Sequence, residues 1–229
     1  MFFDPLYLLI AAPALIFMLY AQWRVTSTYK KYAKVANLQD KTGAEVAALL
    51  LQANGINDVN VEETKGTLTD HFDPRKKVLR LSRDIYRLSS VSAMGIVAHE
   101  VGHAVQHNKG YMPMKIRGTL VPVANVGTWV GYIFFVLGML LSVANLIWIG
   151  VIFFSAAVLF ALVTLPVEFD ASARARQMLN RNGLVTFAEA DGVSAVLSAA
   201  ALTYVGALLQ AVSNLLYYVL LASGMSRRD

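Results

Sequence analysis

The segment His99-Glu100-Val101-Gly102-His103 is the part of the chain whose residue types and spacing best suit chemistry. Residues four apart share one face of a helix, so the imidazoles of His99 and His103 can bind one metal ion. Zinc suits this set, because two imidazoles and one carboxylate leave a fourth position open for a water whose pKa falls to about 7. Glu100, next to His99, is placed to act on that water as a general base. The pattern predicts a zinc metallopeptidase; the alternative is two ordinary histidines on a helix.

The third metal ligand lies outside this motif. His107 is excluded because it would lie about 12 Å along the helix axis from His99, too far for one ion to bind both. The carboxylates beyond this helix are Glu168, Asp170, Glu189, Asp191 and Asp229. We expect Glu168 to be the ligand, since it follows an apolar run at the start of a new helix and can reach back to the metal helix. We expect Asp170 to orient a histidine or an arginine; the alternative is that both acidic groups only favour a helix N-terminus.

The helix that must carry the motif has recognisable ends. Ser90 or Ser92 can cap its start, and Asn108-Lys109-Gly110 suits a left-handed end. The residues between these ends are mostly apolar, so we expect the helix to be buried. Burying histidine and glutamate side chains costs free energy unless they are paired or bound to metal. Their place in this helix therefore favours a functional metal site over a chance pattern on the surface.

The chain of 229 residues is 56% hydrophobic, too apolar for an ordinary soluble domain. The excess lies in four runs, each long enough to span a bilayer core, which takes about 20 residues: Leu6–Gln22, Thr119–Val143, Leu146–Leu165 and Val193–Ala222. The first run follows the acidic Met1–Pro5 rather than a basic segment, so we expect a retained anchor and not a cleaved signal. Gly127-x-x-x-Gly131 in the second run permits close helix packing.

Basic residues predict the orientation in the membrane. The segment from Arg24 to Arg117 holds fifteen of the twenty lysines and arginines, and three more lie between Arg174 and Arg181. Two spans separate these segments, so both are expected in the cytoplasm and Ala144-Asn145 outside. The net charge of +5 is therefore assigned to topology and not to nucleic-acid binding. Cysteine is absent, which excludes disulfides and cysteine nucleophiles.

Between the first span and the metal helix, the sequence predicts a small α+β unit. Its elements are a basic helix at Val25–Ala36 that contacts lipid headgroups or continues the first span, a short helix opened by the capping box Thr42–Glu45, a strand at Val59–Glu62, and a hairpin of Thr67–Phe72 with Lys77–Ser82. Farther on, Pro166 is expected to end the third span or to begin a separate helix over Val167–Leu179. A second capping box, Thr186–Glu189, precedes the last run.

The predicted fold is a mainly α membrane protein, with about four transmembrane helices and a small cytoplasmic α+β zincin-like unit. Its predicted parts are an anchor (1–23), the cytoplasmic unit with the metal helix (24–118), two transmembrane helices (119–165), a cytoplasmic segment with the third ligand (166–192), and a long transmembrane helix with its tail (193–229).

Three further stretches carry a family resemblance. They are Asp70–Ser82, Ala98–Ala104 and Val167–Ser172. Together they resemble the YugP-like neutral zinc metallopeptidases of prokaryotic membranes, along nearly the whole chain. The resemblance implies a membrane-embedded zinc endopeptidase of the prokaryotic inner membrane, with His99, His103 and Glu168 as ligands and Glu100 as base. The chain is more distantly similar to the HtpX-like and CAAX prenyl protease group, from which it departs by having Ser172 where those proteins carry an aspartate.

The predicted function is hydrolysis of peptide bonds in a polypeptide substrate, with membrane-bound or misfolded proteins favoured by the location. His71 is a candidate for stabilising the oxyanion; a turn residue is its alternative. The hairpin edge is expected to bind an extended peptide through its backbone. The competing interpretation is a non-catalytic zinc-binding scaffold, or pseudoprotease, in the bilayer. A zinc transporter is disfavoured because the first three runs carry no ionisable residue. Oligomerisation or a membrane partner stays open.

Overall fold

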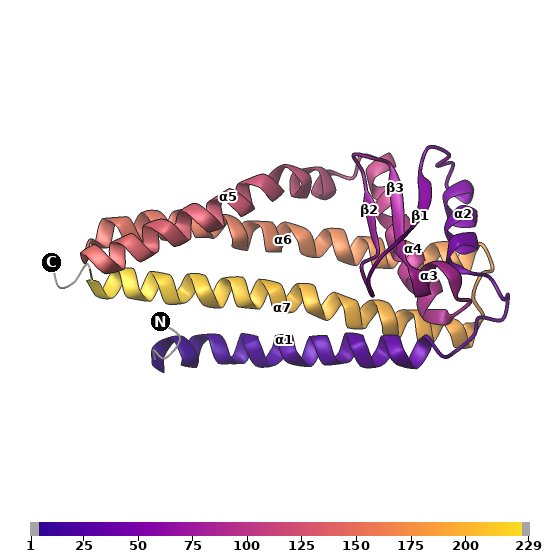
Figure 1. The fold of residues 1–229 in the computed structure, drawn as a ribbon, viewed down its shortest axis with the longest axis horizontal. Helices are drawn as coiled ribbons and strands as arrows, with labels where there is room; N and C mark the ends of the chain where they lie inside the picture. The colour runs from indigo at the N-terminus through magenta and orange to yellow at the C-terminus, as the bar shows by residue number, and fades with distance from the viewer. Residues whose placement is uncertain (1–4, 226–229) are drawn as a thin grey trace. The chain divides into compact units, whose positions relative to one another are not determined.

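The computed structural model describes residues 5–225, so the acidic residue Asp4 and the Arg227-Arg228 pair lie outside it. The elements, in chain order, are α1 (Pro5–Tyr32), α2 (Gly43–Ala53), β1 (Asn60–Thr64), β2 (His71–Asp73), β3 (Val78–Ser82), α3 (Arg83–Arg87), α4 (Val91–Asn108), α5 (Met112–Leu141), α6 (Ala144–Arg181) and α7 (Phe187–Met225) (Figure 1).

The elements form two compact units. The first, here called the helical unit, comprises the segment ending at Ala21, Lys115–Pro166 and the segment from Leu202 onward. The second, here called the mixed unit, comprises Gln22–Met114 and Val167–Ala201, and contains the sheet. Each is described by itself.

Four helices of the described residues are long and apolar enough to cross a membrane: α1, α5, α6 and α7. Each of the four apolar runs seen in the sequence falls in one of these helices, except that Ser142 and Val143 lie just past the end of α5. The prediction of four candidate spans is confirmed. Many large apolar side chains on these helices face outward, for example Leu9, Trp129 and Ile152. Such a surface is suited to lipid and costly in water.

In the helical unit, α5 and α6 approach closely through glycines. A Cβ atom on Gly131 would lie 2.9 Å from the carbonyl oxygen of Gly150, and one on Gly150 would lie 2.7 Å from that of Gly131. A Cβ on Gly127 would likewise meet the Phe153 carbonyl oxygen at 2.9 Å. The Gly-x-x-x-Gly pair therefore does what its spacing predicts, since only residues without a side chain permit this backbone contact.

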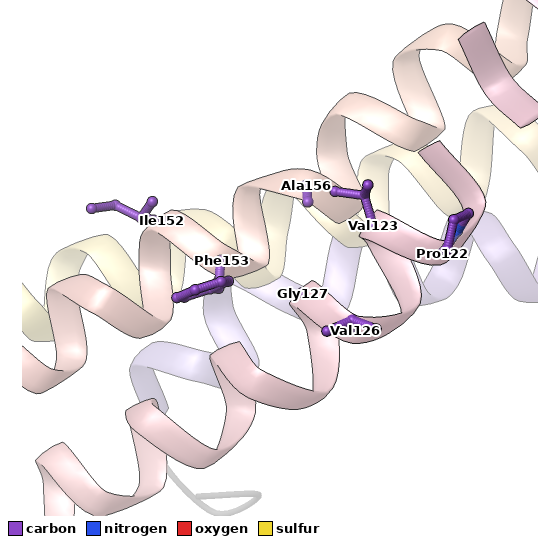
Figure 2. A pocket seen from close by; sticks show the side chains of 7 residues that line it. All are labelled: Pro122, Val123, Val126, Gly127, Ile152, Phe153 and Ala156. Atoms are coloured by element: carbon purple, nitrogen blue, oxygen red, sulfur yellow. The ribbon is translucent and has the colours of Figure 1, made fainter. Parts of the chain in front are cut away.

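An apolar cavity of about 530 Å³ lies between α5 and α6 beside this contact. Figure 2 shows its lining, which is Pro122, Val123, Val126 and Gly127 of α5 with Ile152, Phe153 and Ala156 of α6. Pro122 has no backbone N–H to donate to the helical turn before it, a defect that helices in membranes tolerate. A cavity lined only by carbon-rich groups favours hydrocarbon over water.

The mixed unit contains a three-stranded sheet in the order β1-β3-β2. β1 runs parallel to β3, with Val61 opposite Leu79, and β2 runs antiparallel, with Phe72 opposite Leu79. The predicted strand and hairpin are confirmed, but β2 is shorter than expected. Leu68 adopts a left-handed φ of 56°, which a strand does not accommodate, so pairing begins only at His71.

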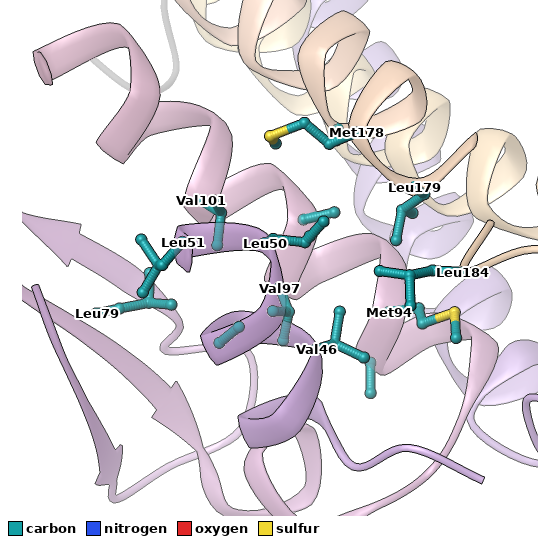
Figure 3. Packing of buried hydrophobic residues seen from close by; sticks show 14 of the residues in the cluster. Val46, Leu50, Leu51, Leu79, Met94, Val97, Val101, Met178, Leu179 and Leu184 are labelled. Atoms are coloured by element: carbon teal, nitrogen blue, oxygen red, sulfur yellow. The ribbon is translucent and has the colours of Figure 1, made fainter. Parts of the chain in front are cut away.

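The core of the mixed unit lies between the sheet and helices α2, α4 and α6 (Figure 3). Leu50 of α2, Leu79 of β3 and Val97 of α4 are each fully buried. Burying one such side chain stabilises the fold by about 1.5–3 kcal/mol. Because α4 packs in this core, the position of the metal motif is set by apolar contacts on the faces of α4 around it.

The helix ends follow the predicted capping chemistry. Thr42 and Glu45 form a reciprocal capping box at α2, and Thr186 and Glu189 do the same at α7. Ser90 caps α4 by accepting a hydrogen bond from the Ala93 N–H. These contacts satisfy backbone donors that have no partner inside a helix.

Two predicted boundaries are wrong. Pro166 lies inside α6, which continues without a break from Ala144 to Arg181. An interior proline costs about 3 kcal/mol, but the apolar residues at Val167, Ala171 and Ala175 are fully buried and keep the following turns helical. The predicted separate basic helix after the first span is instead the end of α1, which is the alternative weighed above.

Candidate metal centre

Helix α4 carries both histidines and the glutamate of the motif. It begins at its Ser90 cap and is followed by Gly110, whose φ of 63° gives the expected left-handed end. His103 is 7% exposed, and the apolar neighbours Val101 and Ala104 are buried in the core. The motif is thus held on a rigid, buried helix rather than on a loop.

Helix α6 brings the third member of the group, the acidic residue Glu168, to α4. A Cβ atom on Gly102 would lie 2.7 Å from the carbonyl oxygen of Ala171, so the two backbones nearly touch at the centre of the motif. This close approach places Glu168, one turn before Ala171 on α6, beside the histidines. Its side chain is 3% exposed.

Three atoms converge to form the centre. Oε2 of Glu168 lies 3.2 Å from Nε2 of His99 and 3.4 Å from Nε2 of His103. Ligand atoms about 2.0–2.1 Å from a zinc ion at tetrahedral angles are about 3.3 Å apart, which these distances match. The three side chains form the group of histidine and acidic residues that could hold a metal ion among residues 5–225. The donor set therefore fits zinc.

The outer nitrogen of each histidine has its own partner. Nδ1 of His99 lies 3.1 Å from the Ser172 hydroxyl, and Nδ1 of His103 lies 2.9 Å from Oε1 of Gln106. These contacts leave both Nε2 atoms facing Glu168. Ser172 is thus the partner of His99 on α6.

Asp170 contacts neither histidine directly. Its Oδ2 accepts hydrogen bonds from Nε2 of Gln106 at 2.8 Å and from Nε of Arg174 at 2.6 Å. Of the two roles expected for Asp170, the pairing with an arginine is therefore present. Its link to a histidine runs through Gln106.

Glu100 lies under strand β2. Its Oε2 accepts a hydrogen bond of 3.0 Å from the backbone N–H of Phe72. Burial raises the pKa of the Glu100 carboxyl above its usual value, although the neighbouring histidines act in the opposite direction. A carboxylate with a raised pKa is a better proton acceptor, as a general base requires.

His103 is subject to opposing effects. Burial, the largest single effect, disfavours the charged form of His103. The hydrogen bonds to Glu168 and Gln106 and the charges of Glu100 and Glu168 together outweigh burial and raise the pKa of the imidazole. The same carboxylate would share a metal ion with His103. A metal ion and a proton therefore compete for its Nε2.

The remaining two histidines, His71 and His107, do not belong to the group of His99, His103 and Glu168. His71 is exposed in β2, and its Nδ1 donates to the Thr69 carbonyl oxygen over 2.8 Å, which matches the turn role weighed for it. His107 is exposed in the last turn of α4, with its ring 5.9 Å from that of Phe72. It also lines a polar surface pocket with Phe72 and Ala104.

Gln106 is the site residue that the sequence reasoning missed. It is fully buried, three residues after His103, in a helix that is otherwise almost wholly apolar there. A buried polar side chain one turn from a metal-binding histidine is the pattern that could have revealed it.

Comparisons with known proteins identify the family to which the chain belongs. The chain belongs to the family described as "Putative neutral zinc metallopeptidase", whose model matches residues 7–223. It is 48% identical over 216 residues to the "Putative membrane protease YugP" of Bacillus subtilis (strain 168), an alignment that covers 94% of this chain and 95% of that protein. No solved structure matches the chain significantly.

Proposed function

We propose that this chain is a membrane-embedded zinc metalloendopeptidase of the gluzincin type, with His99, His103 and Glu168 as ligands. The observation that carries the proposal is that Oε2 of Glu168 lies 3.2 Å from Nε2 of His99 and 3.4 Å from Nε2 of His103. A second carboxylate, Glu100, lies on α4 with the two histidines. When bound, zinc polarises a carbonyl group and lowers the pKa of a water.

Glu100 performs the proton transfers. It takes a proton from the attacking water as the water oxygen bonds to the scissile carbonyl carbon. The carbon–nitrogen bond then breaks as Glu100 returns that proton to the leaving amine. The Phe72 N–H holds one oxygen of Glu100, so the carboxylate has a fixed orientation for this work.

Strand β2 is the proposed docking edge for substrate. It lies at the edge of the sheet, and its residue Phe72 contacts Glu100. An extended polypeptide that adds to this edge would bring its backbone beside the base. His71 on the same strand remains a candidate for stabilising the oxyanion.

We further propose that the site faces the cytoplasm of a prokaryotic cell and acts on membrane-bound or misfolded polypeptides. The side is testable because the chain has no cysteine, so introduced ones are unique. Lys65→Cys, Lys109→Cys and Arg181→Cys should be protected from an impermeant thiol reagent in whole cells, while Asn145→Cys reacts. Labelling of Lys65→Cys and Asn145→Cys from the same side would overturn the four-span topology.

The catalytic proposal is tested with Glu100→Gln in purified protein. Casein cleavage should fall by at least about 100-fold, because general-base catalysis contributes about 10²–10⁴-fold, while zinc stays near one ion per chain. Glu62→Gln, an exposed change on β1, is the matched control and should keep both zinc and activity. A wild type that binds no zinc would reject the proposed enzyme, and a fully active Glu100→Gln variant would reject Glu100 as the base. A wild type that binds zinc but does not cleave casein would favour the zinc-binding scaffold.

A further inference from the structure

Gln106 joins the two helices that carry the metal ligands. Its side-chain oxygen Oε1 lies 2.9 Å from Nδ1 of His103 on α4. Its side-chain nitrogen Nε2 donates to the Val167 carbonyl oxygen and to Oδ2 of Asp170 on α6, both over 2.8 Å. The residue is 0% exposed, so bulk water does not reach these bonds.

The orientation of the amide follows from its partners on α6. A backbone carbonyl and a carboxylate can only accept hydrogen bonds, so the amide NH₂ of Gln106 must face Val167 and Asp170. The amide oxygen must then face His103. Because that oxygen can only accept, Nδ1 of His103 must carry the proton.

This arrangement determines which atom of His103 is free to bind metal. With its proton on Nδ1, the neutral imidazole presents the lone pair of Nε2, the atom 3.4 Å from Glu168. We propose that Gln106 is a positioning residue, whose amide uses the Val167 carbonyl and Asp170 on α6 to fix the ring orientation and protonation of His103 on α4. The proposal rests on the zinc centre proposed above.

Asp170 and Arg174 complete the arrangement. Nε of Arg174 donates to the same Oδ2 atom of Asp170 over 2.6 Å, and the Arg174 guanidinium lies over the ring of Tyr111 at 5.7 Å. The arginine holds the Asp170 carboxylate in place through a charge-assisted hydrogen bond. Asp170 therefore acts on His103 through Gln106.

The hydrogen bond from Gln106 to Val167 also connects the Gln106 amide to the backbone beside Glu168. Val167, whose carbonyl Gln106 holds, immediately precedes Glu168 on α6. One side chain thus sets both the ring of His103 and the backbone next to Glu168. Loss of the amide should therefore weaken the site from two sides at once.

The test measures zinc affinity by competition with a chelator and the visible absorption of the protein loaded with Co²⁺. Gln106→Leu should weaken zinc binding by about 10–100-fold and alter the Co²⁺ spectrum, as loss of a partner of a ligand does. Gln106→Glu keeps an acceptor for His103 but cannot donate to α6. It should weaken binding by a similar factor, because its carboxylate would face the Val167 carbonyl and Asp170.

Asp170→Leu adds a coupling measurement. It should weaken zinc binding by less than Gln106→Leu, and the double variant should bind no more weakly than Gln106→Leu alone, because Asp170 acts through the amide. Ser92→Ala removes a buried polar group elsewhere on α4 and should leave zinc affinity unchanged. Equal unfolding temperatures of the metal-free proteins would show that the variants keep their fold.

The outcomes separate the two proposals. Zinc affinity of Gln106→Leu within threefold of the wild type, or an equal loss in Ser92→Ala, would overturn the role of Gln106. Full affinity in Gln106→Glu would overturn the link to α6. A wild type that binds no zinc would reject the proposed function, and with it this inference.

Discussion

Two close helix contacts on α6 use glycine in the same way but have different surroundings. At Gly102, α4 meets α6 with a projected Cβ contact of 2.7 Å, and at Gly131, α5 meets α6 with one of 2.9 Å. The first contact is flanked by His103, Glu168 and Gln106. The second lies beside the predominantly apolar cavity between α5 and α6 (Figure 2).

The comparison separates close packing from chemistry. Glycine lets two backbones approach, and in a lipid-facing helix pair that approach is itself the source of stability. At Gly102 the same approach brings polar side chains from two helices within hydrogen-bonding distance. The described polar atoms of this centre are all partnered, which is what makes their burial tolerable.

The largest expected effect comes from removing the acidic ligand on the α6 side of the first contact. Glu168→Ala should lower zinc affinity by more than about 100-fold and abolish proteolysis, because loss of a ligand exceeds the loss of a ligand's partner. Zinc affinity is measured by chelator competition. His107→Ala is the control and should keep its zinc. Retention of zinc in Glu168→Ala, with loss in His107→Ala, Asp170→Ala or Glu189→Ala, would show that the ligand is misassigned.

A smaller effect is expected from placing a methyl group at Gly102, where α4 contacts α6. In Gly102→Ala the new methyl group meets the Ala171 backbone at 2.7 Å, so α6 must shift away and carry Glu168 with it. We expect about 1–3 kcal/mol lower stability and weaker zinc binding, as in overpacked cores. Gly95→Ala, on the same helix, would meet Val193 at an ordinary 3.6 Å and should be neutral or stabilising. Equal behaviour of the two variants in thermal unfolding and zinc titration would contradict this account.

The smallest effect on zinc is expected at the second contact. Gly131→Ala should lower the unfolding temperature in detergent, because its methyl group meets backbone atoms of Gly150 and Phe154 at 2.9 and 3.0 Å. Zinc affinity should stay within threefold of the wild type, since no ligand lies in the helical unit. Gly118→Ala on the same helix has open space around it and serves as control. A loss of zinc in Gly131→Ala would show that the two contacts are coupled.

The sequence predicted much of the fold because its patterns are local. Apolar runs of about 20 residues, reciprocal capping pairs such as Thr42 with Glu45, and a residue at positive φ such as Gly110 each report on a few neighbouring residues. Pro166 misled the prediction because a local rule for ending helices was overridden by burial of the turns that follow it.

The candidate site was predictable where a motif, or the small number of carboxylates beyond α4, limited the choice of residues. The motif identified His99, Glu100 and His103, and the helical rise excluded His107. The partners of the histidines were harder to find, because they depend on the distance between α4 and α6. That distance is set by Gly102 against Ala171, which no pattern within one helix reveals.

The two edges of the small sheet differ in how they guard against self-association. On β1, Glu62 and Glu63 carry charge and form ion pairs with Arg80 and Arg87. On the other side, β2 is three residues long, and one of its N–H groups is already used by Glu100. Charged or very short edge strands resist pairing with another copy of the same sheet. Neither edge of the sheet is therefore a good template for aggregation.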